Sequence, residues 1–118
     1  FCFILFFNNP NSLEDLITSL EIRSSEEISN YFDSNSEIII NEKVSKGNKF
    51  QLTKTLDNFF NENNLREFKI IHKGDTQNNI IYMLAEYSSN DDIYKVFLTL
   101  LKAEKKYIIQ KFKIDIRE

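Results

Sequence analysis

The residues best suited to chemistry lie in one stretch of this 118-residue sequence, between positions 68 and 88. His72 is the only histidine, and an imidazole with a pKa near neutrality can act as a general acid or base. Such catalysis would need a partner directed at the ring, and the candidates are Glu86 and Tyr82 on the following segment. The simpler interpretation is that His72 ends a strand and bonds to backbone, and we favour it over a catalytic role.

Composition and charge exclude several other kinds of site. The single cysteine, Cys2, rules out an intrachain disulfide or a cysteine-based metal cluster, and we expect no metal and no cofactor. The 15 basic and 18 acidic residues are interspersed, so no basic stripe is available to follow a nucleic-acid backbone. The sequence also has no glycine-rich phosphate loop, nucleophile elbow or HExxH pattern.

The first seven residues, FCFILFF, form an apolar run that ends abruptly at NNPNS. Seven residues are too few to span a bilayer, but they match the end of the apolar region of a signal peptide. We therefore expect residues 1–8 to be a signal-peptide remnant and the protein to be exported, to the bacterial periplasm or beyond. Two alternatives stay open: the run is a first strand or helix lead-in of a cytoplasmic protein, or Cys2 carries a lipid.

The first elements predicted along the chain are helices, and they pack on the sheet that carries His72. Ser12 with Asp15, and Ser24 with Glu27, have the spacing of helix starts, and apolar residues follow each pair at helical intervals. The polar cluster DSNS is expected to end the second helix. A third amphipathic helix is predicted over residues 50–60. The domain proper is expected to cover residues 12–117.

Strands are predicted from short runs of β-branched and aromatic residues. These runs cover residues 37–44, 66–73, 79–88, 92–103 and 107–117. The last four are joined by connections so short that neighbours must run antiparallel, as a meander. Three N-terminal helices with one interposed strand, packed on a bent antiparallel sheet, give an α+β fold.

The two middle strands of this meander are apolar on both faces, which is unusual for a sheet with helices on one side only. We expect the face away from the helices to expose four residues: Met83, Tyr87, Phe97 and Leu101. An apolar patch of this size marks a partner surface, and a symmetric homodimer through the open sheet face explains it most simply. The alternative is that the N-terminal segment or a loop covers the patch.

Four stretches carry a resemblance to a known family: SEEISNYFDSNSEIII, QLTKTLDNFFNEN, FKIIHKG and YKVFLTLLKAEKKYIIQKFKIDIRE. Together with the order of elements over residues 12–117, they resemble the nuclear transport factor 2-like superfamily, and within it a small bacterial family of uncharacterised secreted proteins. The resemblance implies a cone in which helices lie in the concavity of a bent sheet, and a signal peptide before the domain. The superfamily includes isomerases, dehydratases, cyclases and non-catalytic dimers, so the fold alone does not choose an activity.

Such a cone would form a ligand pocket where polar groups stand among apolar ones. The candidates for this pocket are His72, Tyr82, Tyr94 and Gln110, the last because it interrupts an apolar face of the final strand. We expect a non-catalytic, exported dimer that binds a small apolar molecule or a protein. The alternatives are an isomerase or lyase using His72 with Glu86 or Tyr82, and a structural domain whose cone is filled.

Overall fold

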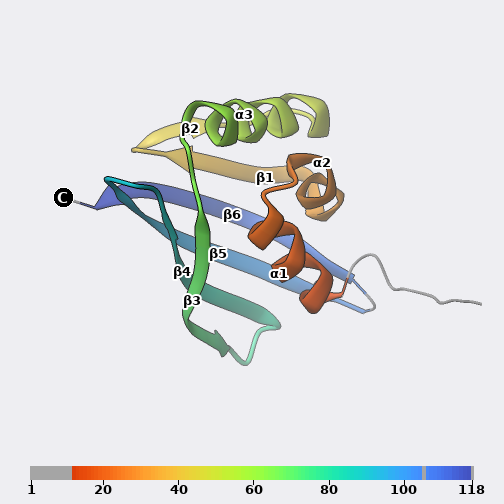
Figure 1. The fold of residues 1–118 in the computed structure, drawn as a ribbon. Coiled ribbons are helices and arrows are strands. Elements are labelled where there is room, and N and C mark those ends of the chain that lie inside the picture. The colour runs from red at the N-terminus through yellow and green to blue at the C-terminus, as the bar shows by residue number, and fades with distance from the viewer. Residues whose placement is uncertain (1–11, 105, 118) are drawn as a thin grey trace, which may run out of the picture.

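The computed structural model describes residues 12–104 and 106–117, and the predicted signal-peptide remnant lies outside them. Helices and strands follow in the predicted order, except that two strands stand where one was predicted before the third helix (Figure 1). The helical elements are α1 (Leu13–Ile22), α2 (Ser25–Ile28), the 3-10 turn η1 (Ser29–Tyr31) and α3 (Lys49–Glu62). The strands are β1 (Phe32–Ile40), β2 (Lys43–Ser45), β3 (Glu67–Asp75), β4 (Ile80–Ser88), β5 (Ile93–Ala103) and β6 (Lys106–Arg117).

The helix starts are fixed by side chains that satisfy free backbone N–H groups. The Ser12 hydroxyl accepts from the Asp15 N–H at 3.1 Å, as its spacing predicted. At α3 the side chains of Asn48 and Gln51 each accept from the other's backbone N–H, which completes a capping box. These caps set the phase of α1 and α3, so that both turn an apolar stripe toward the sheet.

The second helix and the strand after it differ from the prediction. Helical structure ends at Tyr31, and β1 begins at Phe32, five residues before the predicted strand. Within DSNS the Asp33 N–H donates to the Ser36 hydroxyl at 2.8 Å, and that hydroxyl donates to the Ile109 carbonyl. The buried Ser36 therefore holds an irregular segment of β1 against β6, where the sequence alone indicated only a helix end.

The predicted strand over residues 37–44 is a hairpin. Asn41 and Glu42 both have positive φ angles, 49° and 72°, which are typical of a two-residue type I′ turn. β2 then pairs antiparallel with β1, and the Asn41 carboxamide accepts from the Ile116 N–H at 2.9 Å. Asparagine tolerates the left-handed conformation better than most residues, which favours a turn at this point.

The six strands form one mixed sheet in the order β2-β1-β6-β5-β4-β3. β3 to β6 make the predicted antiparallel meander, and β1 pairs parallel with β6, far away in sequence. All helices lie on one side of this sheet (Figure 1), and we call that side the inner face and the opposite side the outer face. No helix among the described residues is long and apolar enough to cross a membrane.

Candidate functional site

The space between the helices and the inner face is filled by side chains. Leu16, Leu20, Leu52 and Leu56 from the helices pack with strand residues that include Leu98 and Phe112. Every buried side-chain N or O atom among the described residues has a hydrogen-bond partner. The inner face therefore presents no unpaired polar group to a ligand. This arrangement is the one expected for the alternative in which side chains fill the cone.

The tyrosines of the inner face are held by protein groups. The Tyr87 hydroxyl donates to the Leu20 carbonyl at 2.7 Å, and the Tyr94 hydroxyl donates to the Asn63 side-chain oxygen at 2.8 Å. Burial raises the pKa of both hydroxyls above the usual value for tyrosine, because the phenolate would lose its hydration. Of the four predicted pocket residues only Tyr94 lies on this face, and its polar tip is already used.

Gln110 points away from the interior because β6 contains a bulge. The register with β5 passes from Thr99–Lys111 to Leu100–Ile109, so Gln110 has no partner on β5 and is exposed. The bulge also reverses the alternation before it, and Ile109 is buried instead of Ile108. The placement of Gln110 in a pocket was therefore wrong.

His72 is displaced by a second bulge, at Ile71 in β3. The alternation with Phe68 and Ile70 placed His72 on the inner face, but the extra residue turns it outward, opposite Leu84. Its ring is exposed, and Nε2 lies 3.3 Å from the Tyr82 hydroxyl. The structure thus brings together two predicted pocket residues, His72 and Tyr82, on the outer face and not within the cone.

Glu86 also lies on the outer face and not within the cone, where the enzyme hypothesis needs it. It pairs across the strands with Lys69 and Lys95, and its carboxylate accepts from the Arg117 guanidinium at 3.2 Å. No hydrogen bond joins Glu86 to His72 among the described residues, and the two belong to successive cross-strand rows. The His72–Glu86 pair of the enzyme hypothesis is therefore not assembled, whereas the alternative partner, Tyr82, lies beside His72 on the outer face.

The predicted dimer residues divide between the two faces. Phe97 and Leu101 lie on the outer face and are partly exposed, as predicted. Met83 and Tyr87 are 1% and 0% exposed, because pairing with Leu98 and Tyr94 places them on the inner face. Assigning them to an open patch was therefore wrong. The outer residues of β4 that the prediction missed include Leu84, which is 40% exposed.

One signal in the sequence could have corrected this error. Glu86 shares its alternation with Tyr82 and Leu84, whereas Met83, Ala85 and Tyr87 form the other set. A carboxylate is costly to bury, so its set belongs to the solvent side of β4.

The outer face is organised as three rows that cross the sheet, defined by strand pairing. The central row contains Val44, Ile39, Lys113, Phe97, Leu84 and His72, and is mostly apolar. On one side of it the charged row contains Asp115, Lys95, Glu86 and Lys69, with alternating signs. On the other side the polar row contains Glu37, Lys111, Thr99, Tyr82 and Gly74.

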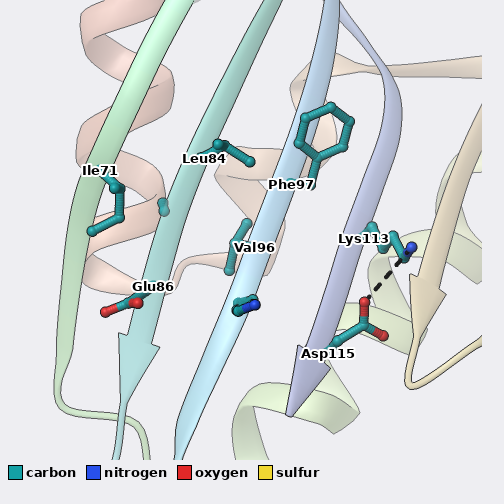
Figure 2. Close-up of a pocket in the computed structure, with 9 residues that line it drawn as sticks. Ile71, Leu84, Glu86, Val96, Phe97, Lys113 and Asp115 are labelled. Atoms are coloured by element: carbon teal, nitrogen blue, oxygen red, sulfur yellow. Dashed lines mark ion pairs between the residues drawn. The ribbon is translucent and has the colours of Figure 1, made fainter. Parts of the chain in front are cut away.

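A hollow of about 360 Å³ lies between the central and charged rows. Figure 2 shows Ile71, Leu84 and Phe97 around its apolar part, with Glu86 and the Lys113–Asp115 ion pair at its charged end. The ammonium and carboxylate of that pair are 3.8 Å apart. The hollow therefore has an apolar floor beside charges of both signs.

Comparison with known proteins identifies the family. The family model for the domain of unknown function DUF4783 matches residues 13–115, nearly the whole chain. This chain belongs to that family. No curated protein matches the sequence at a significant level.

Solved structures show the same fold in relatives of the DUF4783 domain. A DUF4783 family protein from Bacteroides ovatus superposes with a TM-score of 0.81 at 20% identity, covering 93% of this chain and 99% of that one. An NTF-2 like protein of unknown function from Silicibacter pomeroyi gives 0.64 at 14% identity, covering 89% and 92%. A protein of unknown function with a cystatin-like fold from Nostoc punctiforme gives 0.64 at 15%, covering 85% and 81%.

These likenesses confirm the resemblance drawn from the sequence and the α+β fold that it implied. They concern the fold alone, since every identity is low and none of the three described proteins has a stated activity. The function of this DUF4783 domain must therefore be argued from its own surface.

Proposed function

We propose that this domain is a non-catalytic interaction module that forms a homodimer through the outer face of its sheet. The observation that carries the proposal is the central row, where Phe97 and Leu84 are paired neighbours on a sheet face that no helix or strand of the described residues covers. A sheet face that remains wet is normally lined with polar residues.

The exposure of the outer apolar residues supports this assignment. Leu84 is 40% exposed, and Ile71 and Val44 are each 53% exposed, although they belong to ordered strands. Leu84 and Ile71 line one hollow together with Phe97, and exposed apolar residues that gather in this way often mark a binding region. A second copy is the favoured occupant because the flanking rows carry charges of both signs, so the surface can complement itself.

A small apolar molecule is the second candidate for the same face, because the hollow of about 360 Å³ is within the size range of ligand pockets. Its lining comes from strands β3 to β6, and no element of the described residues covers it, whereas ligand sites usually bury most of their ligand. The isomerase or lyase hypothesis gains no support from the contacts of His72, which lies in the open beside Tyr82.

The test is the subunit number of the full 118-residue chain, measured by native mass spectrometry and sedimentation over a concentration series. We expect a dimer that Leu84→Lys converts to a monomer, because a buried unpaired ammonium would oppose the contact. Phe50→Lys is the matched control, since Phe50 is 75% exposed but belongs to α3, away from the outer face. A dimer that survives Leu84→Lys and dissociates with Phe50→Lys would contradict the proposal.

Two further outcomes are informative. A chain that stays monomeric at all concentrations contradicts the homodimer. A monomer that instead carries a bound small molecule would show a discrete extra mass. If Leu84→Lys removes that mass, the outer face binds a small ligand and not a second copy. Wherever Leu84→Lys or Phe50→Lys is compared with the unchanged chain, the thermal unfolding of the two proteins must match, which shows that the variant is folded.

A further inference from the structure

His72 lies within the outer-face surface that the proposed homodimer would use, and it is the only histidine of the chain. Histidine is the side chain that ordinarily changes its charge between about pH 5 and pH 8. We infer that His72 makes the dimer sensitive to pH: the neutral ring permits association, and protonation of the ring separates the two copies. This inference rests on the proposed homodimer and concerns the regulation of the same face.

The position of His72 places it inside a contact centred on the apolar residues of the central row. His72 pairs with Leu84 across β3 and β4, and Leu84 pairs with Phe97 on β5. Adjacent strands are about 4.8 Å apart. An interface of standard size buries roughly 800 Å² on each partner, which is a patch roughly 28 Å across. A second copy seated on Leu84 and Phe97 would therefore also cover the His72 ring, which is exposed in the single chain.

In the single chain the ring is open to water and has one polar neighbour. The Tyr82 hydroxyl lies 3.3 Å from Nε2, and it can donate to the unprotonated nitrogen of a neutral ring. The adjoining charged row contributes Lys69 on β3 and Glu86 on β4. The Glu86 carboxylate accepts from the Arg117 guanidinium at 3.2 Å, so it is already engaged by a cation of its own chain.

The other charged groups near β3 do not face the ring. Lys73 and Asp75 pair with residues of β4 that are buried on the inner face, so their side chains point to that side of the sheet. Helix α1, whose first turn is acidic, also contacts β3 from the inner side (Figure 1). Among the described residues no strand lies beyond β3, which is the edge of the sheet. The charges around a covered His72 would therefore be decided by the partner.

The partner's central row offers no carboxylate to the ring, because this row contains Lys113 and no acidic residue. Sheets that pack face to face usually align their strands to within about 30°. A two-fold axis along the strands lays one central row on the other, so the ring meets another member of that row. A two-fold axis that follows the central row lays His72 on its own counterpart. In both arrangements a protonated ring is covered by an apolar group, an ammonium or a second imidazolium, which opposes association.

A neutral ring does not meet this cost. Its carbon atoms extend the apolar surface of Leu84, and the Tyr82 hydroxyl pairs with Nε2 within the same chain. Association therefore opposes a protonation that the single chain accepts freely, and such linkage weakens the dimer as pH falls. Free histidine is half-protonated at about pH 6.5, so one pH unit below this value should weaken the dimer about tenfold for each ring that the contact keeps neutral.

The test is sedimentation of the full chain over a concentration series at pH 7.5 and pH 5.5, a range in which most carboxylates keep their charge. We expect the dimer dissociation constant to rise about tenfold or more on acidification. His72→Gln keeps a polar side chain that cannot be charged, so its constant should be the same at both pH values.

A permanent charge at the same position should reproduce the effect of acid. His72→Lys should raise the dissociation constant about tenfold or more already at pH 7.5, because its ammonium is charged throughout this range. Phe50→Lys is the matched control on α3 and should leave the constant unchanged. Thermal unfolding at each pH identifies the temperatures at which every variant is folded, and the constants are compared there.

The outcomes separate this inference from the proposal beneath it. A dimer with the same constant at pH 7.5 and pH 5.5 keeps the homodimer and overturns the pH dependence. A dimer that weakens equally in His72→Gln assigns the effect to another group, and also overturns the inference. A chain that stays monomeric at both pH values and all concentrations overturns the homodimer together with its regulation.

Discussion

The inner and outer faces of the sheet are formed by the same strands, but they differ in how far their side chains are buried and paired. On β5 the adjacent residues Leu98 and Phe97 show the difference: Leu98 is fully buried beneath the helices, and Phe97 is half-buried on the outer face. On the inner face even tyrosine hydroxyls have protein partners. The comparison indicates that the interior maintains the fold, while the exterior retains exposed apolar surface, which the proposed homodimer would use.

The comparison predicts its largest effect for truncation on β5. Leu98→Ala should lower the free energy of unfolding by about 3 kcal/mol, because a leucine cavity in a packed core is only partly refilled. Phe97→Ala should cost less than about 1 kcal/mol in the monomer, although it removes more atoms, since its site is already open to water. Urea unfolding at concentrations that keep the chain monomeric measures both values, and equal losses would contradict the difference between the faces.

A smaller effect is expected at the buried hydroxyl of Tyr87. Tyr87→Phe leaves the ring but removes the donor to the Leu20 carbonyl, and should cost about 1 kcal/mol at neutral pH. Tyr82→Phe on the outer face is the matched control, and its loss should be near zero because water can replace the hydroxyl's contact. A loss in the control as large as that of Tyr87→Phe would contradict this prediction.

The same tyrosines predict how stability depends on pH. Burial raises the pKa of Tyr87, and burial with the nearby Asp15 and Glu27 carboxylates raises the pKa of Tyr31 to about 12. Above pH 10 the unfolded chain releases protons that the folded chain retains, so stability must fall as pH rises, by up to about 1.4 kcal/mol per unit for each such tyrosine. Unfolding measured between pH 8 and pH 12 should show this fall, and Tyr87→Phe should make it shallower. If Tyr87→Phe leaves the slope of the unfolding free energy against pH unchanged, the ionisation of Tyr87 does not contribute to the fall in stability.

The smallest effect is expected at the close contact of Gly74 with Tyr82 on the outer face. A Cβ at Gly74 would lie 2.6 Å from the Tyr82 hydroxyl oxygen, so Gly74→Ala must displace the ring. Because that ring is on the surface and can turn, the loss should stay below about 1 kcal/mol. In a Tyr82→Ala background the same substitution should have no cost. A double-mutant cycle measures this coupling, and an equal loss in both backgrounds would show that the strain is in the backbone.

The part of the fold that the sequence predicted depends on local rules. Capping side chains at Ser12 and Ser24, the apolar stripe of α3 and the tight connections of the meander each act within a few residues. These features can be interpreted from the sequence alone, because the structures that they specify do not depend on contacts with distant residues. They also placed Phe97 and Leu101 correctly on the outer side of β5.

The candidate site was predicted poorly because its residues depend on strand register. Alternation divides β4 into two sets of side chains but does not say which set faces the helices, and this placed Met83 and Tyr87 wrongly. At His72 and Gln110 a single extra residue reverses the alternation, and a bulge leaves no mark in the spacing of apolar residues. Both kinds of error moved a side chain from one face to the other.

The position of β6 has a consequence for the order in which the chain can fold. This strand lies inside the sheet, hydrogen-bonded to β1 on one side and β5 on the other, although it follows every other strand in sequence. During synthesis, β1 and β2 therefore cannot join the meander until residues 106–117 have emerged from the ribosome. Contacts between distant segments also slow folding. The sheet formed by the described residues therefore stays incomplete until β6 has joined β1 to β5.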